Sequence, residues 1–279
     1  MENELAPERS ICTQLKEIKQ PHQIALVLLS YVLKRPKTWL LAHPELHLTD
    51  SQALELDSLI NRLENGEPLP YLVGKQDFFG LEFEVNQMVL IPRPETEMMV
   101  DVALGWLKAH PSARKGIDVG TGSGIIAVSL VNNCPDLHLL ATDISQEALE
   151  VANHNAEKHN SADRICFACV DLLPETTENV DLICANLPYI PTSKLSEVNS
   201  LGWEPTLALD GGESGLNLID QLLGRSTTIM NTPGLLLLET EETLGKQTVE
   251  LARRYFPTAE ITLYQDLAHR DRLVTIEMK

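Results

Sequence analysis

The sequence predicts an α/β protein with a mostly parallel, seven-stranded sheet, preceded by a small helical bundle and a β-hairpin. Three observations predict this fold class. From residue 95 onward, short apolar segments alternate with helical patterns, which is typical of a parallel sheet with helices on both faces. A glycine-rich turn follows the first of these strands, and an acidic residue follows the next one. The first 75 residues carry helical patterns only.

The composition is that of an ordinary globular protein with an acidic balance. Its 279 residues suffice for one large α/β domain with a small appendage, or for two domains. The net charge of −18 disfavours nucleic acid as the main partner, because phosphate contacts require a basic face. No apolar run approaches the ~20 residues that span a bilayer. Met1 to Ser10 is acidic and polar, unlike a signal peptide, so we expect a cytoplasmic protein without a membrane partner.

Residues 1–75 are predicted to form the helical bundle. Ile24–Leu33 is strongly apolar and contains neither glycine nor proline, so it predicts a helix. Asp50–Glu64 has apolar residues at helical spacing and a capping residue at its start, which is Thr49 or Asp50. Prolines separate these segments and end the helices.

Residues 76–92 are predicted to form a hairpin that links the bundle to the sheet. Apolar and polar residues alternate from Phe78 to Val85, which predicts a strand. Asn86-Gln87 then predicts a turn into a second strand at Met88–Ile91.

Residues 93–279 are predicted to form the main α/β domain. The predicted strands are Gly116–Val119, Leu137–Ala141, Arg164–Val170, Val180–Ala185, Leu235–Glu239, Ile261–Leu263 and Arg272–Ile276. The predicted helices are Glu95–Ala109, Ile125–Asn132, Gln146–Asn160, Gly215–Asn231 and Glu242–Tyr255. The last two strands have no helical pattern between them, so we expect them to pair antiparallel.

The cysteines and histidines do not predict a metal site. Cys166 and Cys169 have CxxC spacing but lie in a segment that we interpret as a buried strand. Side chains three residues apart on a strand point to opposite faces, so these two thiols are not expected to share a metal or a disulfide. The eight histidines form no HExxH pattern.

The loop Gly120-Thr121-Gly122-Ser123-Gly124 runs from a predicted strand into a predicted helix. Such a loop lets a ligand approach the backbone and exposes amide groups at a helix N-terminus. Its spacing is GxGxG. The dinucleotide fingerprint GxGxxG would need glycine at position 125, where this chain has Ile125, so a dehydrogenase is disfavoured.

Two acidic residues follow the next strands. Asp143 comes 19 residues after Gly124, where a carboxylate can accept hydrogen bonds from ribose hydroxyls; its alternative role is to cap the following helix. Asp171-Leu172 ends a further strand and is either an adenine contact or a simple strand-end turn. Together with the glycine loop, Asp143 favours a nucleoside-type cofactor.

The run Asn186-Leu187-Pro188-Tyr189 follows the apolar strand 180–185. Ligand sites of open α/β sheets lie at the carboxyl ends of the strands, so this run is expected to face the glycine loop. The oxygen of Asn186 and the carbonyl of Leu187 can accept both hydrogens of a planar amide or amine and stabilise the charge that develops there. Tyr189 can stack on the planar group, and Pro188 stiffens the backbone. The residue types therefore indicate methylation of a nitrogen, whereas a turn without function is the alternative.

Further motifs accompany these two across nearly the whole chain. They are Glu67-Pro68-Leu69-Pro70-Tyr71-Leu72-Val73-Gly74, Leu90-Ile91-Pro92-Arg93-Pro94-Glu95-Thr96-Glu97, Trp203-Glu204-Pro205, Ala208-Leu209-Asp210-Gly211-Gly212 and Asp266-Leu267-Ala268-His269-Arg270-Asp271-Arg272. With them the sequence resembles the class I, Rossmann-like methyltransferases that use S-adenosyl-L-methionine to modify a glutamine side-chain nitrogen in peptide-chain release factors, often called HemK or PrmC.

The resemblance implies roles for individual residues. Gly120 to Gly124, Asp143 and Asn186 would contact S-adenosyl-L-methionine, with Asp171-Leu172 near the adenine. Asn186 to Tyr189 would hold the glutamine of a Gly-Gly-Gln loop in a class I release factor, and the helical domain would bind that protein. Arg93 and Glu97 either shape the pocket or form an ion pair that orients the first helix of the catalytic domain.

Leu187 departs from the family, which has Asn-Pro-Pro-Tyr at this place. The residue contributes its backbone carbonyl, so the change removes stiffness and keeps the acceptor. Asn-Leu-Pro-Tyr is also the form of ribosomal RNA adenine dimethyltransferases, so an N6-adenine methyltransferase acting on RNA or DNA is the main alternative. The acidic charge disfavours it. A cofactor-binding module without catalysis would have lost Asn186 or the glycines, and both are present.

Overall fold

A computed structural model describes residues 10–11, 21–175, 178–198 and 202–279. The chain divides into two compact units, Met1–Gly74 and Lys75–Lys279. Most of the polar start at Met1 to Ser10 lies outside the described residues. Among the helices that are described, none is long and apolar enough to cross a membrane.

The first unit is helical. Its described helices are α2 (His22–Leu33), α3 (Lys37–Ala42), α4 (Asp50–Glu64) and α5 (Leu69–Val73). The N-cap of α4 is Thr49, whose hydroxyl accepts from the backbone N–H of Gln52, while the Gln52 side chain accepts from the backbone N–H of Thr49. Leu28, Leu29 and Leu56 are fully buried in a separate core within this unit.

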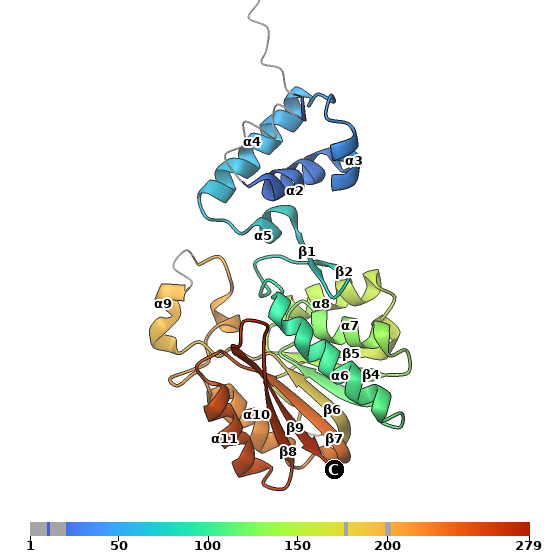
Figure 1. Ribbon diagram of the computed structural model, residues 1–279, viewed down its shortest axis with the longest axis vertical. Coiled ribbons are helices and arrows are strands. Elements are labelled where there is room, and N and C mark those ends of the chain that lie inside the picture. Colours follow the sequence, from blue (N-terminus) through green and yellow to red (C-terminus); the bar gives the residue numbers. More distant parts are fainter. Residues whose placement is uncertain (1–9, 12–20, 176–177, 199–201) are drawn as a thin grey trace, which may run out of the picture. The chain divides into compact units, whose positions relative to one another are not determined.

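The second unit contains the seven-stranded sheet, in the order β5-β4-β3-β6-β7-β9-β8 (Figure 1). Its strands are β3 (Lys115–Val119), β4 (His138–Asp143), β5 (Ile165–Cys169), β6 (Val180–Ala185), β7 (Met230–Glu239), β8 (Glu260–Gln265) and β9 (Asp271–Met278). The first five in this order are parallel, and β9 runs antiparallel to both β7 and β8. The predicted fold class and the antiparallel last pair are confirmed.

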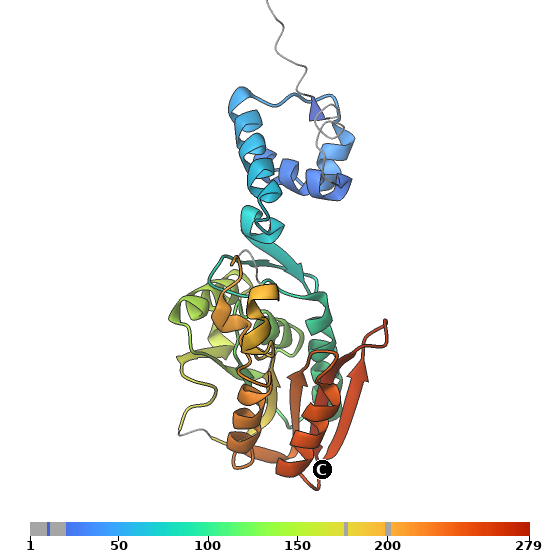
Figure 2. The ribbon, with the colours of Figure 1, turned by 90° about the vertical axis from the view of Figure 1, so that its left-hand side faces the viewer.

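Helices cover both faces of this sheet (Figure 2). The described helices of this unit are α6 (Glu97–Ala109), α7 (Ile125–Asn133), α8 (Gln146–Lys158), α9 (Leu195–Val198), α10 (Asn217–Ser226) and α11 (Gly245–Tyr255), and the short α9 is not one of those that cover the sheet. Short 3-10 turns lie at Pro94–Thr96, Ala162–Arg164, Thr192–Lys194 and Thr206–Ala208. Apolar residues of α6, α7 and α8 form one core with the sheet, and those of α10 and α11 form another on the opposite face.

The hairpin differs from its prediction. Its strands are β1 (Lys75–Phe78) and β2 (Leu81–Glu84), and the turn lies at Phe79-Gly80, not at Asn86-Gln87. Phe79 and Gly80 both have positive φ, 48° and 74°, as a tight two-residue hairpin turn requires. The Glu97 side chain accepts from the backbone N–H of Phe79 at 2.8 Å and so binds the turn. The segment Met88–Ile91 forms no strand.

Two more predictions were wrong for reasons of tertiary structure. The helix predicted to reach Asn231 ends at Ser226, because Met230 already pairs with Val180 of β6 at the start of β7. The strand around Cys166 and Cys169 is not buried: both thiols are exposed, since β5 is the edge strand of the sheet.

Candidate active site

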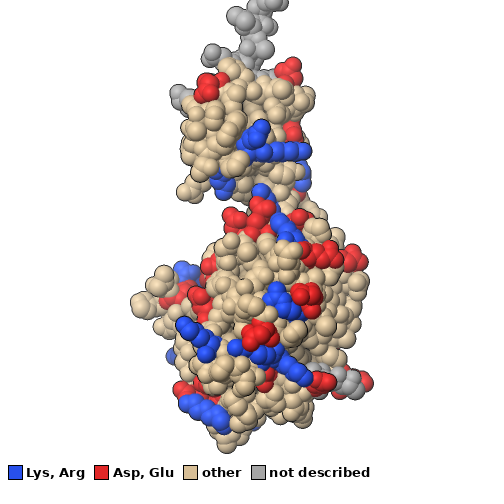
Figure 3. Space-filling model, turned by 90° about the vertical axis from the view of Figure 1, so that its right-hand side faces the viewer, with Lys and Arg blue, Asp and Glu red and all other residues tan. Residues whose placement is uncertain are grey.

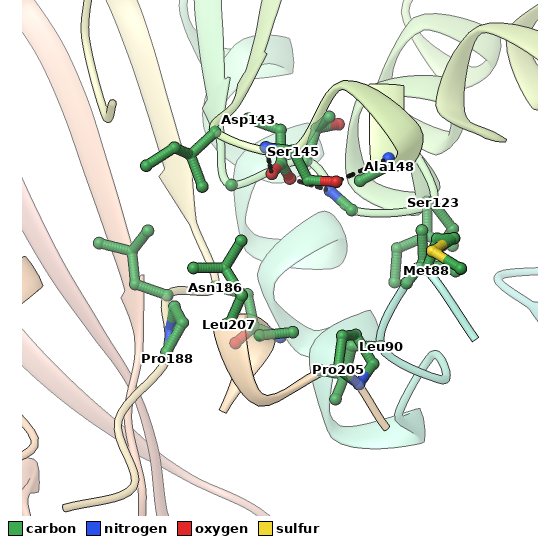
Figure 4. Close-up of a pocket in the computed structure, with 18 of the residues that line it drawn as sticks. Met88, Leu90, Ser123, Asp143, Ser145, Ala148, Asn186, Pro188, Pro205 and Leu207 are labelled. Carbon is green, nitrogen blue, oxygen red and sulfur yellow. Dashed lines mark hydrogen bonds between the residues drawn. The ribbon is translucent and has the colours of Figure 1, made fainter. Parts of the chain in front are cut away.

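A cavity of about 490 Å³ opens at the carboxyl ends of four neighbouring parallel strands, β3, β4, β5 and β6 (Figure 4). Most of its lining comes from residues 88–93, 120–123, 143–145, 170–172, 186–188 and 205–208. The glycine loop, both acids and most of the Asn-Leu-Pro-Tyr run therefore meet in one place. The sequence predicted this meeting from the direction of parallel strands alone.

The three glycines of the loop have positive φ and three different surroundings. No atom lies within 4 Å of the place where a side chain of Gly122 would begin, so the backbone there is open to the cavity. At Gly120 a Cβ would lie 3.2 Å from Leu187 Cδ2, and at Gly124 it would lie 3.1 Å from Ala152 of α8. Gly124, which does not line the cavity, allows α8 to pack closely. The loop thus gives a ligand direct access to backbone at Gly122.

Asp143 ends β4 and lines the cavity. One of its oxygens accepts from the backbone N–H of Gly122 at 2.9 Å, and the other accepts from the backbone N–H of Ser145 at 3.0 Å. The cap of α8 is Ser145, whose hydroxyl accepts from the N–H of Ala148 at 3.1 Å. Each carboxylate oxygen can accept further bonds, so Asp143 is available to ribose hydroxyls beside the glycine loop.

Asp171 and Leu172 both line the cavity. Leu172 is buried and has a φ of 59°, and its carbonyl accepts from the Thr142 hydroxyl at 2.7 Å. Arg225 donates to the Asp171 carbonyl at 2.7 Å and lies 3.6 Å from its carboxylate. The pair is therefore a strand-end turn that also faces the cavity, which suits an apolar and an acceptor contact to a flat ring.

Asn186, Leu187 and Pro188 line the cavity, whereas Tyr189 is not among its lining residues. Leu187 is only 4% exposed, and its side chain packs beside the glycine loop. Burial, and then the nearby Glu239 carboxyl, raise the pKa of the Tyr189 phenol, which keeps it neutral. Its stacking on a substrate stays a prediction.

Arg93 and Glu97 do not form the ion pair that was one of their two predicted roles. Arg93 pairs with Glu204 at 2.6 Å, while Glu97 accepts from the hairpin turn. Glu204 also accepts from the backbone N–H of Ile91 at 3.2 Å. Glu204 thus connects the segment 88–93 to the start of the segment 205–208, and both segments line the cavity.

Four residues around the site had no predicted role: Thr96 and Glu204, which lie within motifs named above, and Asn155 and Glu239. The fully buried Asn155 donates to the carbonyls of Ser123 and Glu84 and accepts from the N–H of Glu84, so it joins the glycine loop to the hairpin. Its signal was a polar residue on the apolar face of a predicted helix. The signal of Glu239 was an acid at the end of the wholly apolar strand 235–238.

Gly211 packs against the backbone of the Asn-Leu-Pro-Tyr run. A Cβ at this position would lie 2.7 Å from Tyr189 Cα and 2.8 Å from the Pro188 carbonyl oxygen. We expect Gly211→Ala to lower the free energy of unfolding by about 1–3 kcal/mol and to lower turnover as well, because backbone must shift to make room. Denaturant titration and initial rates measure both effects. Gly105→Ala is the matched control. Gly105 lies in α6, and no atom lies within 4 Å of the Cβ that alanine would add. This variant should reduce neither the free energy of unfolding nor the turnover.

Asp118 is fully buried under the glycine loop. One of its oxygens accepts from the Thr121 hydroxyl at 2.6 Å and from the Ala127 N–H at 3.2 Å, but the other has no partner. Burial raises the pKa of Asp118 to about 7.

A carboxyl with a raised pKa stabilises the fold below its ordinary pKa and loses that stabilisation as the pH rises through the folded-state value. We therefore expect the free energy of unfolding of Asp118→Asn, relative to the unmodified protein, to increase between about pH 4 and about pH 7. Chemical denaturation across this range measures the difference. A difference that is constant with pH would contradict the assignment.

Two family models and several curated relatives match this chain. Residues 9–74 match the family described as PrmC N-terminal domain, and residues 99–200 match the methyltransferase small domain. The release factor glutamine methyltransferase of Nitratidesulfovibrio vulgaris is 33% identical, over 92% of this chain and 88% of its own. That of Moorella thermoacetica is 38% identical, over 91% of this chain and 90% of its own.

Solved structures confirm the fold. The catalytic domain of hMettl16 in complex with MAT2A 3′UTR hairpin 6 has a TM-score of 0.57 at 17% identity, covering 83% of each chain. The ribosomal protein L11 methylase of Lactobacillus delbrueckii has a TM-score of 0.50 at 19% identity, covering 70% of this chain and 84% of its own. The fold is thus that of methyltransferases, and the identity to curated relatives over nearly the full length shows that this chain belongs to the release factor glutamine methyltransferase family.

Proposed function

We propose that this protein transfers a methyl group from S-adenosyl-L-methionine to the side-chain N5 of the glutamine in the Gly-Gly-Gln loop of class I peptide-chain release factors. One observation carries the proposal. Asn186, Leu187 and Pro188 line the same cavity as the glycine loop and Asp143, so a methyl donor and a planar amide can be held face to face.

The residues of the cavity fit the methyl donor that the family implies. S-adenosyl-L-methionine supplies an electrophilic methyl group on a sulfonium. Asp143 would accept from the ribose hydroxyls, and the open backbone at Gly122 would allow close approach. Asp171 and Leu172 would contact the adenine, whose amine donates and whose ring is apolar on its faces. The loop residues Gly120, Thr121 and Ser123 also line the cavity, and Gly124 allows the loop to pack against α8.

The run 186–189 would act on the substrate amide. A carboxamide nitrogen is a weak nucleophile, because its lone pair is delocalised into the carbonyl. Asn186 Oδ1 and the Leu187 carbonyl can each accept one of its hydrogens, which fixes the nitrogen and stabilises the positive charge that develops on it. Alignment of nitrogen and methyl group supplies a large part of the rate.

The partner would be the release factor itself. Residues 1–75 would bind that protein. Their described part is a helical unit with its own core. The hairpin 76–92 and the catalytic region 93–279 would follow along the chain. We expect no direct role for nucleic acid. On the face of the larger unit shown in Figure 3, basic side chains lie among acidic ones. A release factor as substrate would imply a cytoplasmic enzyme.

Incubation with labelled S-adenosyl-L-methionine tests the proposal. A purified release factor and total RNA are offered in separate reactions and together. Label is expected on the release factor and absent from RNA. Label on RNA alone would contradict the proposal and favour N6-adenine methylation. Label on neither would contradict it too, provided that the protein binds the methyl donor.

A further inference from the structure

The orientation of the Asn186 side chain decides whether its oxygen or its nitrogen faces a substrate. Only the oxygen can accept a hydrogen bond from a substrate amide. In the structure Asn186 Nδ2 donates to the hydroxyl of Thr96 at 3.2 Å. Thr96 is completely buried, belongs to the Ile-Pro-Arg-Pro-Glu-Thr-Glu motif and also lines the cavity. The hydroxyl that receives the Asn186 amide therefore lies at the inner end of the site.

Behind Thr96 and Asn186 stands a buried carboxyl group. Glu239 ends β7, which neighbours β6 in the sheet, and it is only 5% exposed. Its Oε2 is buried without a hydrogen-bond partner. The Thr96 hydroxyl and the Asn186 amide both lie close enough to lower the pKa of Glu239, although burial, the largest effect, raises it to about 7.

We propose that Thr96 and Glu239 are positioning residues that hold the Asn186 carboxamide with its nitrogen turned toward them and its oxygen facing the substrate. This inference rests on the proposed function. The Thr96 hydroxyl has one hydrogen: while its oxygen accepts from Asn186, it can donate to the Glu239 carboxyl. When Glu239 is ionised, the flipped orientation would bring the amide oxygen against a carboxylate oxygen, which has no hydrogen to donate, and this is unfavourable in a buried place. The pair thus selects one of two amide orientations.

Substitutions at Thr96 separate hydrogen bonding from packing. Thr96→Val keeps the shape and removes the hydroxyl, whereas Thr96→Ser keeps the hydroxyl and removes a methyl group. For Thr96→Val we expect kcat on a release factor to fall about 10- to 100-fold, because the acceptor is no longer aligned. The Kd for S-adenosyl-L-methionine should stay within a few-fold of the unmodified value. Thr96→Ser should restore most of the lost kcat, which a purely structural role of the methyl group would not produce.

Two further variants complete the test. Thr275→Val makes the same change at a buried position on β9, outside the lining of the cavity, and should leave kcat unchanged. Glu239→Gln keeps the size of the side chain but adds a donor that competes with the Asn186 amide, so kcat should fall here as well. If Thr96→Val does not fold, Glu239→Gln still tests the inference.

The inference is overturned if Thr96→Val or Glu239→Gln turns over like the unmodified protein, or if Thr96→Ser is as slow as Thr96→Val. A different result, in which the unmodified protein itself transfers no methyl group to a release factor, would contradict the proposed function instead.

Discussion

Asn186→Ala is expected to lower methyl transfer to a release factor at least about 100-fold, a loss typical of removing one group that stabilises charge in the transition state. The side chain follows β6 directly and lines the cavity with its neighbours Leu187 and Pro188. Without it, one of the two acceptors for the substrate amide is missing, because the alanine side chain has no hydrogen-bond acceptor. The backbone of the glycine loop and Asp143 are untouched.

For this reason the variant should keep its affinity for S-adenosyl-L-methionine within a few-fold. Isothermal titration with the methyl donor and steady-state rates with the release factor measure the two effects separately. Asn153→Ala is a suitable control, because Asn153 lies exposed on α8 and bonds only to Glu157 among the described contacts. Unchanged turnover of Asn186→Ala would refute the proposed mechanism.

The second large effect is expected at Asp143. Asp143→Ala should weaken binding of S-adenosyl-L-methionine about 10- to 100-fold, since hydrogen bonds to a charged group contribute about 1.5–3 kcal/mol. The change removes the acceptor for ribose and also frees the N–H of Gly122, which the carboxylate holds at 2.9 Å. The loop conformation and the ligand contact are lost together.

Asp143→Asn separates these contributions, because it keeps one oxygen and removes the charge. Calorimetric Kd values for both variants give the comparison, and Asp163→Ala is the control, because Asp163 is exposed and does not line the cavity. An affinity of Asp143→Ala equal to that of the unmodified protein would exclude the ribose role.

The sequence predicted the alternation of strands and helices because periodicity is a local property. It failed where the outcome depends on neighbours in space. Phe79 fits a strand pattern, yet it occupies the hairpin turn, where Glu97 binds its backbone N–H. The exposure of Cys166 and Cys169 follows from the position of β5 at the sheet edge, which no local pattern contains.

The site, like the fold, was predictable only where local sequence patterns determine it. Motifs at the ends of parallel strands had to meet, so the glycine loop, Asp143 and Asn186 could be placed together from sequence. Thr96, Asn155 and Glu239 could not be placed, because their roles arise from contacts between distant segments. Asn155 joins residues 71 and 32 positions away, and Thr96 meets Asn186 across 90 positions.

The central claim is that the methyl group goes to the glutamine of the Gly-Gly-Gln loop, and peptide mass spectrometry of the modified release factor tests it most directly. The protein is incubated with S-adenosyl-L-methionine and either a normal release factor or one whose loop carries Gly-Gly-Glu. The account predicts the added mass of one methyl group on that glutamine side chain, and none on the Gly-Gly-Glu protein. A methyl group on another residue, or equal methylation of both proteins, would contradict it.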